Sequence, residues 1–465
     1  MGRFFVVKKR VNRYRFTFFE SELCSGRKPH FPHSRPSSNE YQAEEYLHQG
    51  SDPGNGPMRA TLLLIPILLT AVLTGCTTIL PPDLPPLPSM AQPYVKVVTI
   101  PLPVVASSPN EGVTYGALSA FLLHNDKDEI TTLIAPQVNH NDNFGTTATL
   151  YGAFYPSPAR SFEMNLSKSS HVNEDYELRV RDQGQQLELN AFLYGFTDGS
   201  ARFFGFRSDS SAAKESNFGD RELGFTFSAG YPILDHTQLF VGDRYRDVRV
   251  VKGAVRKLPF IRDAFPQEEV PGSGGFRTHA QMMALVYSTL DSQAMPSTGV
   301  RARVMAEASL ASLGSSAGFQ HYEAEFKGFY PVSDARFISA GRLAYSQTRG
   351  ENVPFLERSA LGGETSLRGY GRNRFVDSSY LLCNLEQRIR LFRWEVFGVR
   401  ADWELAPFLD IGGVMESLGD LKGKNLELNP GIGFRAVVRP NILGRIDVGF
   451  SSEGPAVFVG LGYPF

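Results

Sequence analysis

The sequence predicts an all-β protein: a transmembrane antiparallel β-barrel of about 16 strands, with a long loop folded into its lumen between strands 11 and 12. From Gly112 to Phe465, short runs of alternating apolar and polar residues are separated by turn residues. These runs are about 9–12 residues long, the length that a tilted strand needs to cross a membrane. The array is interrupted at Leu361–Phe375, which is too rich in glycine and charge to be a lipid-facing strand.

Composition excludes several other classes of protein. The 465 residues carry a net charge of -1, so there is no basic field that would attract nucleic acid. Mean hydropathy is -0.19, and the apolar run Ala60–Leu73 is shorter than the ~20 residues of a spanning helix. Cys24, Cys76 and Cys383 form neither a disulfide framework nor a CxxC metal motif. We therefore expect no cofactor, no metal and no nucleic-acid partner.

The N-terminal region has the features of a lipoprotein leader. Residues 58–75 form a signal peptide, with a short basic segment at Met58-Arg59, an apolar run and small residues before the cut. Leu73-Thr-Gly-Cys76 resembles the bacterial lipobox, in which the cysteine is acylated and becomes the mature N-terminus. Because a signal peptide belongs at the start, we expect translation to begin at Met58 and residues 1–57 to be a mis-started or disordered extension. The alternative is a genuine extension whose apolar run is buried as a helix.

Residues 76–111 are rich in proline, which is typical of an extended, polyproline-like linker. Thr77 follows the cysteine in place of the aspartate that typically retains lipoproteins at the inner membrane. The lipobox resemblance therefore implies a lipid-anchored N-terminus at the bacterial outer membrane. We expect the barrel itself to occupy residues 112–465.

Alternation is clear in Val300–Ala308, where valine and alanine share one parity and Arg301, Arg303 and Glu307 share the other. A soluble β-sandwich would also alternate. The membrane barrel is favoured by tight turns and by apolar faces rich in alanine, glycine and terminal aromatic residues. It is also favoured by the last strand, whose apolar parity runs through Tyr463 to Phe465. That ending looks like the signal by which bacterial outer-membrane barrels are recognised for assembly.

About 16 or 17 strands can be counted after Gly112, and single-chain barrels take even numbers, so 16 is preferred. Counted back from Phe465, the long loop falls between the fifth and sixth strands from the end. A gap of about 30 residues in an array of tight hairpins is the kind of connection that usually carries function.

A motif within this loop resembles a known family. The tip residues Leu367, Arg368, Gly369 and Tyr370 resemble the (V/I/L)-R-G-(F/Y) tip of the long sixth loop in the BamA/TamA superfamily of outer-membrane assembly and secretion barrels. Asp291…Pro296-Ser-Thr-Gly299 resembles the family's D-x-R-D…P-x-G element, although Gln293 replaces the arginine. The resemblance extends over roughly the last four-fifths of the chain.

In that family the loop arginine reaches two acidic residues on the inner barrel wall, and the matching positions here are Glu386 and Asp410. Alternation supports this placement independently, because the neighbouring Leu385 and Leu409 belong to the apolar face. Two carboxylates on one guanidinium make charge-assisted bonds of ~1.5–3 kcal/mol each, enough to keep a glycine-rich loop docked. The alternative is a loop on the extracellular surface with Arg368 solvated.

The resemblance implies an outer-membrane barrel that acts in protein insertion, secretion or lipid movement. BamA-like and secretion members carry periplasmic POTRA domains, and patatin-fused relatives carry an enzyme. Neither pattern precedes Gly112, so we expect a POTRA-less member. Its expected partners are outer-membrane lipid, the barrel-assembly machinery and an unidentified periplasmic protein.

Two other functions are alternatives to this one. The first is a passive or gated pore in which the loop is a constriction. The second is an outer-membrane enzyme such as a phospholipase, which is disfavoured because no Ser/His pair falls at matching inward positions. We therefore expect a protein that is not an enzyme.

Overall fold

The computed structural model describes residues 96–126, 130–157, 159–184, 186–293, 295–332, 336–396, 399–438 and 442–465. The predictions of an extension at 1–57, a signal peptide at 58–75 and lipidation at Cys76 lie outside the described residues. No helix in these ranges is long and apolar enough to span a membrane.

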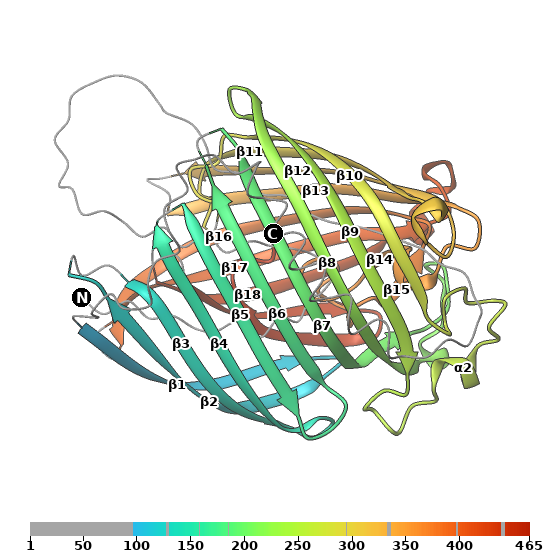
Figure 1. The fold of residues 1–465 in the computed structure, drawn as a ribbon, viewed down its shortest axis with the longest axis horizontal. Helices are drawn as coiled ribbons and strands as arrows, with labels where there is room; N and C mark the ends of the chain where they lie inside the picture. Colours follow the sequence, from blue (N-terminus) through green and yellow to red (C-terminus); the bar gives the residue numbers. More distant parts are fainter. Residues whose placement is uncertain are drawn as a thin grey trace, which may run out of the picture.

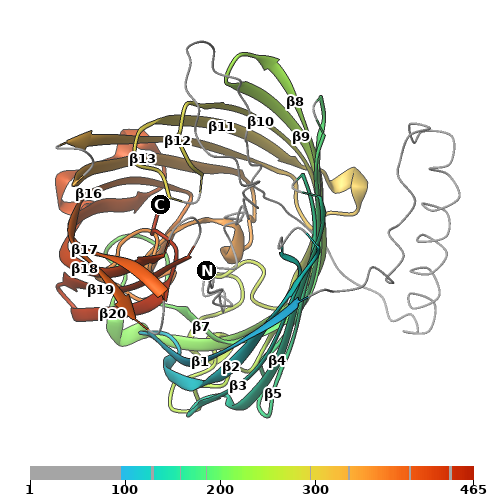
Figure 2. The ribbon, with the colours of Figure 1, turned by 90° about the vertical axis from the view of Figure 1, so that its left-hand side faces the viewer.

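One antiparallel sheet of 18 strands closes on itself to form a barrel (Figure 1, Figure 2). Its strands are β1 (Lys96–Ser108), β2 (Gly112–His124), β3 (Ile130–Asn141), β4 (Gly145–Ser157), β5 (Arg160–Ser169), β6 (Glu174–Gln183), β7 (Glu188–Phe203), β8 (Ser216–Leu234), β9 (Thr237–Val251), β10 (Phe276–Ser288), β11 (Gly299–Ser309), β12 (Phe319–Val332), β13 (Phe337–Gly350), β16 (Ser379–Val396), β17 (Val399–Met415), β18 (Glu427–Val438), β19 (Ile442–Ser451) and β20 (Gly454–Leu461). The predicted all-β barrel is confirmed.

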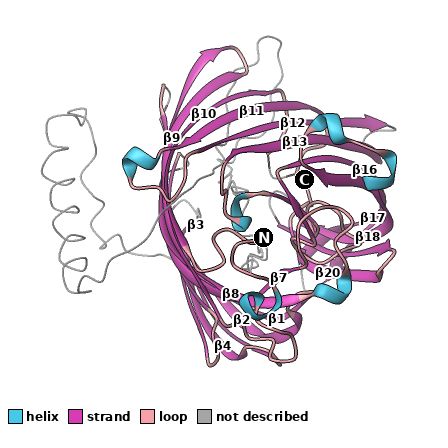
Figure 3. Cartoon of the chain, turned by 90° about the vertical axis from the view of Figure 1, so that its right-hand side faces the viewer, coloured by secondary structure: helices cyan, strands magenta, loops and turns pink. Residues whose placement is uncertain are grey.

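The remaining elements lie in the connections between these strands. They are a small hairpin of β14 (Ser359–Leu361) and β15 (Phe375–Asp377), the helix α2 (Ile261–Ala264) and the 3-10 turns Ala212–Lys214, Ala311–Leu313, Phe355–Glu357, Leu418–Asp420 and Gly423–Asn425. Several of these connections cross the space inside the ring of strands (Figure 3).

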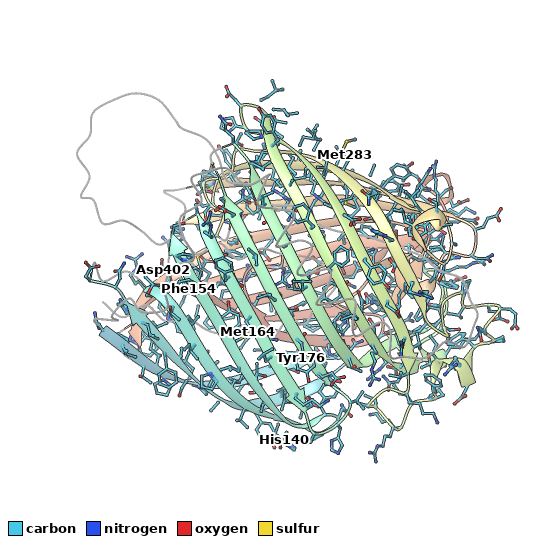
Figure 4. All side chains as sticks on the ribbon, viewed as in Figure 1. His140, Phe154, Met164, Tyr176, Met283 and Asp402 are labelled. Atoms are coloured by element: carbon cyan, nitrogen blue, oxygen red, sulfur yellow. The ribbon has the colours of Figure 1, made fainter. Side chains whose placement is uncertain are left out.

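The two faces of the wall follow the alternation of the sequence. In β11, Arg303 and Glu307 point inward and are 1% and 3% exposed, whereas Val304 points outward and is 53% exposed. Met164 and Met283 lie on the outer wall in the same way (Figure 4). A charged lumen and an apolar exterior are what a barrel surrounded by lipid requires.

The predicted strand count of 16 is wrong, because the barrel has 18 strands. Seventeen of them start at or after Gly112, and the eighteenth is β1, which occupies Lys96–Ser108 within the predicted linker 76–111. The barrel therefore includes Lys96–Ser108 and does not begin at residue 112. Adding β1 restores the even number that single-chain barrels favour.

Because it contains prolines, β1 could not be recognised as a strand from the sequence. Pro101 and Pro103 lie within it, yet β1 pairs with β2 continuously from Lys96↔His124 to Ser108↔Gly112. The two prolines share one parity, so both missing N–H groups lie on the same side of the strand. Such a strand is tolerated where that side carries few ladder bonds, as at the edge of a sheet.

The barrel closes at a short seam between β1 and β20. Among the described residues, Ser107↔Val459 is the one pair between these two strands. Continuing its antiparallel register by two residues places Leu461, the last residue of β20, beside Val105. The earlier part of β1, Lys96–Val104, therefore extends past the end of β20.

The long loop lies between β13 and β16, the thirteenth and fourteenth strands of the barrel. The predicted position between strands 11 and 12 is therefore wrong, for the same reason as the strand count. Counted from the C-terminus, the loop does lie between the fifth and sixth strands.

The last residues do not continue the alternation of β20, which corrects the predicted ending. The strand stops at Leu461, and Gly462 turns the chain with φ +73°. The Tyr463 hydroxyl then donates to Glu404 on the inner wall at 2.8 Å, and Phe465 packs against the cluster of Phe329, Ile338 and Ala340. Figure 2 accordingly marks the C-terminus inside the ring of strands.

Candidate functional site in the barrel lumen

The loop of residues 351–378 turns back on itself inside the barrel. Its hairpin of β14 and β15 leads to a tip that begins at Gly362 and Gly363, with φ of +116° and +101°. Only glycine adopts these angles readily, and a Cβ on Gly362 would lie 2.3 Å from a backbone oxygen of the loop. The tip closes when Gly363 N donates to Tyr370 O at 3.0 Å and Tyr370 N donates to Leu367 O at 3.1 Å.

Apolar residues hold the tip against the wall. Leu367 is 0% exposed and Tyr370 is 2% exposed, in a cluster with residues of β13, β16 and β17. The ring of Tyr370 meets Phe375 edge-on, with centroids 4.8 Å apart. Two of the four motif residues are thus buried by packing, a contribution of about 1.5–3 kcal/mol each.

Arg368 enters a fully buried pocket of acidic side chains. Its Nη1 donates to Glu386 Oε2 at 2.9 Å, and its Nε and Nη2 donate to the two oxygens of Asp410, each at 2.8 Å. The guanidinium also stacks on Phe408, 3.4 Å from the ring centroid. Burial acts to lower the pKa of Arg368, but the coulombic field and hydrogen bonds of Asp410 and Glu386 outweigh it and raise that pKa above its usual range. The guanidinium is therefore permanently charged.

Glu386 is shared by three arginines. Besides Arg368, it accepts from Arg388 Nε at 3.0 Å and from both terminal nitrogens of Arg435 at 2.6 Å. All four side chains are 0% exposed. Arg435 also contacts Asp447 at 3.3 Å, so the loop arginine is one member of a network that runs from β16 to β19.

The tip also approaches the wall at the level of the backbone. A Cβ on Gly449 of β19 would lie 2.2 Å from the carbonyl oxygen of Arg368, and a Cβ on Gly369 would lie 2.7 Å from Asn429. Gly369 N donates to Asn429 Oδ1 at 3.2 Å. Glycine at both positions allows this close approach.

Tyr370 places its hydroxyl at the turn between β19 and β20. The hydroxyl donates to Glu427 of β18 and lies 2.9 Å from Ser452 Oγ. Burial, followed by the hydrogen bond to Glu427, raises the pKa of Tyr370 to about 12. The phenol is therefore neutral at physiological pH.

Sequence reasoning missed the partners of the next two arginines. Arg372 contacts Asn110 and Asp198, and Arg374 contacts Glu453. Alternation could have placed Asp198 on the inner face, but no signal in the sequence indicates which residues meet across the lumen.

One short pattern in the sequence was also missed. Gly314-Ser-Ser-Ala-Gly318 fits G-x-S-x-G, the pattern of a hydrolase nucleophile turn. It lies in the β11–β12 connection rather than between a strand and a helix, and Ser316 Oγ accepts from Arg277 N at 3.3 Å. Its setting gives no support for catalysis. Among the described residues, no group of three or more His, Cys, Asp or Glu side chains could hold a metal ion.

The closed sheet, with its charged lumen and its apolar exterior, defines an integral β-barrel of the bacterial outer membrane. The chain belongs to the Omp85 superfamily, since the model of the Omp85 superfamily domain matches residues 140–437. This match confirms the resemblance drawn from the loop motif.

Solved structures share the fold. BamA from Haemophilus ducreyi lacking POTRA domains 1–3 superposes with a TM-score of 0.51 and 14% identity, over 80% of this chain and 76% of that one. CdiB from Escherichia coli gives a TM-score of 0.52 and 11% identity, over 78% of this chain and 67% of that one. At such low identity the likeness shows the fold alone.

Proposed function

We propose that this barrel acts in the insertion or secretion of proteins at the outer membrane, or in lipid movement there, through its seam. The observation that carries the proposal is the single pair Ser107↔Val459 between β1 and β20 in the described ranges, with Lys96–Val104 extending past β20. Membership of the Omp85 superfamily supports the same function.

An unpaired strand edge is costly in a membrane. Lipid offers no hydrogen bonds, so each unsatisfied backbone group costs several kcal/mol there. The edge of β1 that faces β20, where Ser107↔Val459 is the one pair in the described ranges, therefore favours pairing with a strand from another chain, which is how extended segments add to an exposed sheet edge. The outer side of β1 suits lipid, because Val97 and Val105 are 57% and 63% exposed.

In this proposal the docked loop keeps the lumen ordered while the seam is free to open. Arg368 joins the loop to Glu386 and Asp410, which lie on β16 and β17 and not on the seam strands. The proposal contains no catalytic step. Its partners are outer-membrane lipid, a client strand, and the barrel-assembly machinery or a periplasmic protein that delivers the client.

We also propose that the mature chain begins at acylated Cys76, which would anchor the N-terminus beside the barrel. The lipobox resemblance of Leu73–Cys76 supports this. Cys76→Ser should abolish palmitate labelling of the protein in cells. Labelling that persists in the variant would exclude this anchor.

The function is tested in a strain that lacks the protein, complemented with Met58–Phe465. We expect selective loss of particular barrel or surface proteins, or altered lipid asymmetry, restored by the wild type but not by Arg368→Ala. An unaltered proteome with intact lipid asymmetry would overturn the proposal. Steady conductance of the purified barrel would then favour a pore.

A further inference from the structure

We propose that residues 370–374 of the loop are a clasp that holds the two sides of the β1–β20 seam together, with Arg372 and Arg374 as its positioning residues. This inference rests on the proposed function, because it assigns control of the same seam. It goes beyond the docking of Arg368, whose side chain joins the loop to β16 and β17 alone.

On the β1 side, the clasp contacts the turn between β1 and β2. Arg372 N donates to Asn110 Oδ1 at 2.7 Å, and Asn110 Nδ2 donates back to Arg372 O at 3.3 Å. Asn110 is 5% exposed, although it lies at the tip of a hairpin. A Cβ on Gly371 would lie 2.7 Å from the same Oδ1, so this contact depends on glycine at that position.

Side chains from β7 hold this contact in place. The Arg372 guanidinium donates to Asp198 Oδ2 at 2.6 Å, which fixes the loop backbone that pairs with Asn110. Arg202 Nη2 donates to the carbonyl oxygen of Asn110 at 2.8 Å. The β1–β2 turn is therefore tied to β7 both directly and through the loop.

On the β20 side, the clasp contacts the turn between β19 and β20. Arg374 Nε donates to Glu453 Oε1 at 2.7 Å, and the Tyr370 hydroxyl lies 2.9 Å from Ser452 Oγ. Arg374 is itself held by Ser210, whose hydroxyl and carbonyl oxygens accept at 2.8 and 2.7 Å, and by Phe204, 4.4 Å from the guanidinium. These partners lie between β7 and β8.

The two turns that the clasp contacts join the seam strands β1 and β20 to their neighbours β2 and β19. Between β1 and β20 themselves, Ser107↔Val459 is the one pair in the described ranges. The loop contacts therefore supply much of the bonding across this end of the seam, and undocking the loop would release both turns together.

Distances between spin labels test this directly in the full chain, with Cys24, Cys76 and Cys383 replaced by serine and the protein in lipid vesicles. Labels at Val113→Cys and Pro455→Cys lie on the outer, exposed side of β2 and β20, flanking the seam. We expect one narrow distance population. Asn110→Ala combined with Glu453→Ala removes three hydrogen bonds of the clasp, two at Asn110 and one at Glu453, and should increase a longer, open population by more than about fivefold.

Asp142→Ala and Arg349→Ala are the matched controls, since they remove an exposed acid from a neighbouring turn and an exposed arginine from the end of β13. Both should leave the distances unchanged. If the double variant does not fold, Glu453→Gln provides a milder test, because this side chain is 34% exposed. It should also increase the open population. Arg374→Lys should restore part of the closed population relative to Arg374→Ala, because it retains a charge for Glu453.

Identical distances in the clasp variants and the controls would overturn the clasp, whatever the strain phenotype. A different result is that the clasp variants open the seam and still restore a normal outer-membrane proteome. That result would support the clasp but would contradict the proposal that the seam controls insertion or secretion.

Discussion

Asp410 accepts three hydrogen bonds from Arg368: one from the backbone N at 3.1 Å, and one each from Nε and Nη2 at 2.8 Å. A single wall carboxylate thus fixes both the backbone and the side chain of the loop tip. Asn384 Nδ2 donates to the same carboxylate at 2.8 Å and also donates to the loop at Ser366 O, 2.8 Å away. The part of the tip around Arg368 is therefore fixed by β16 and β17.

Replacing Arg368 by alanine should undock the loop. Among the described residues, Arg368 is the one charged group that donates hydrogen bonds to Asp410. Its loss leaves a buried carboxylate without a cationic partner, which costs about 3–5 kcal/mol. Limited proteolysis within residues 361–375 should accelerate, and the heat-modifiable fraction on gels should fall. Arg368→Ala with Asp410→Asn should recover part of the loss, because the orphaned charge is removed. Wild-type protease resistance in Arg368→Ala would contradict the docked loop.

Glu386 should matter more to the barrel than Asp410 does. Glu386→Gln deprives Arg368, Arg388 and Arg435 of a shared carboxylate, whereas Asp410→Asn affects one arginine, Arg368, and the neutral amide of Asn384. We expect Glu386→Gln to lower the free energy of unfolding by about 3–5 kcal/mol, and Asp410→Asn by less. Urea unfolding in lipid vesicles, followed by tryptophan fluorescence, measures both. Equal effects of the two substitutions would show that the network does not act as a unit.

Alternation explains why much of the wall could be predicted from the sequence. A period of two assigns each residue of a strand to the lumen or to the exterior, so the inward direction of Glu386 and Asp410 follows from their neighbours in the chain. The loop could be located because glycine and charge interrupt that period. The resemblance of Leu367–Tyr370 to a known motif then supplied the partner of the arginine.

Other features could not be predicted, for physical reasons. β1 carries Pro101 and Pro103, which count against a strand everywhere except at an edge, and only closure of the barrel shows where the edge lies. The contact of Asn110 with Arg372 joins residues 262 positions apart, and alternation carries no information about which inward residues meet across a lumen. The inward turn at Gly462 depends on contacts of Tyr463 with Glu404 and Arg388, which lie on other strands.

Gly449→Ala should displace the loop tip without changing any charge. The added Cβ would lie 2.2 Å from the carbonyl oxygen and 2.4 Å from the carbonyl carbon of Arg368, and backbone atoms cannot yield as a flexible side chain does. We expect a loss of about 1–3 kcal/mol, as in other overpacked sites, with faster proteolysis of the loop. Gly444→Ala on the same strand is the control, because nothing lies within 4 Å of its added Cβ. Equal protease resistance of the two variants would argue against this close approach.

Docking of the loop should weaken in alkaline solution through Tyr370. In the docked loop, burial and the hydrogen bond to Glu427 raise the pKa of Tyr370 to about 12, whereas a free phenol titrates near 10. The folded state therefore holds its proton more tightly than the unfolded state. The resulting stability is fully present below pH 10 and is lost as the pH rises through about 12.

The heat-modifiability transition on gels measures this loss when the samples are heated at each pH between about 9 and 12 and are returned to neutral pH only after heating. Other groups titrate in the same range, so the informative quantity is the difference between the wild type and Tyr370→Phe. The phenylalanine variant cannot ionise at this position, and it should lose less thermal resistance over the interval than the wild type. Parallel curves for the two proteins would mean that the Tyr370 hydroxyl does not contribute to docking through its proton. The loop would then be held by Arg368 and by apolar packing alone.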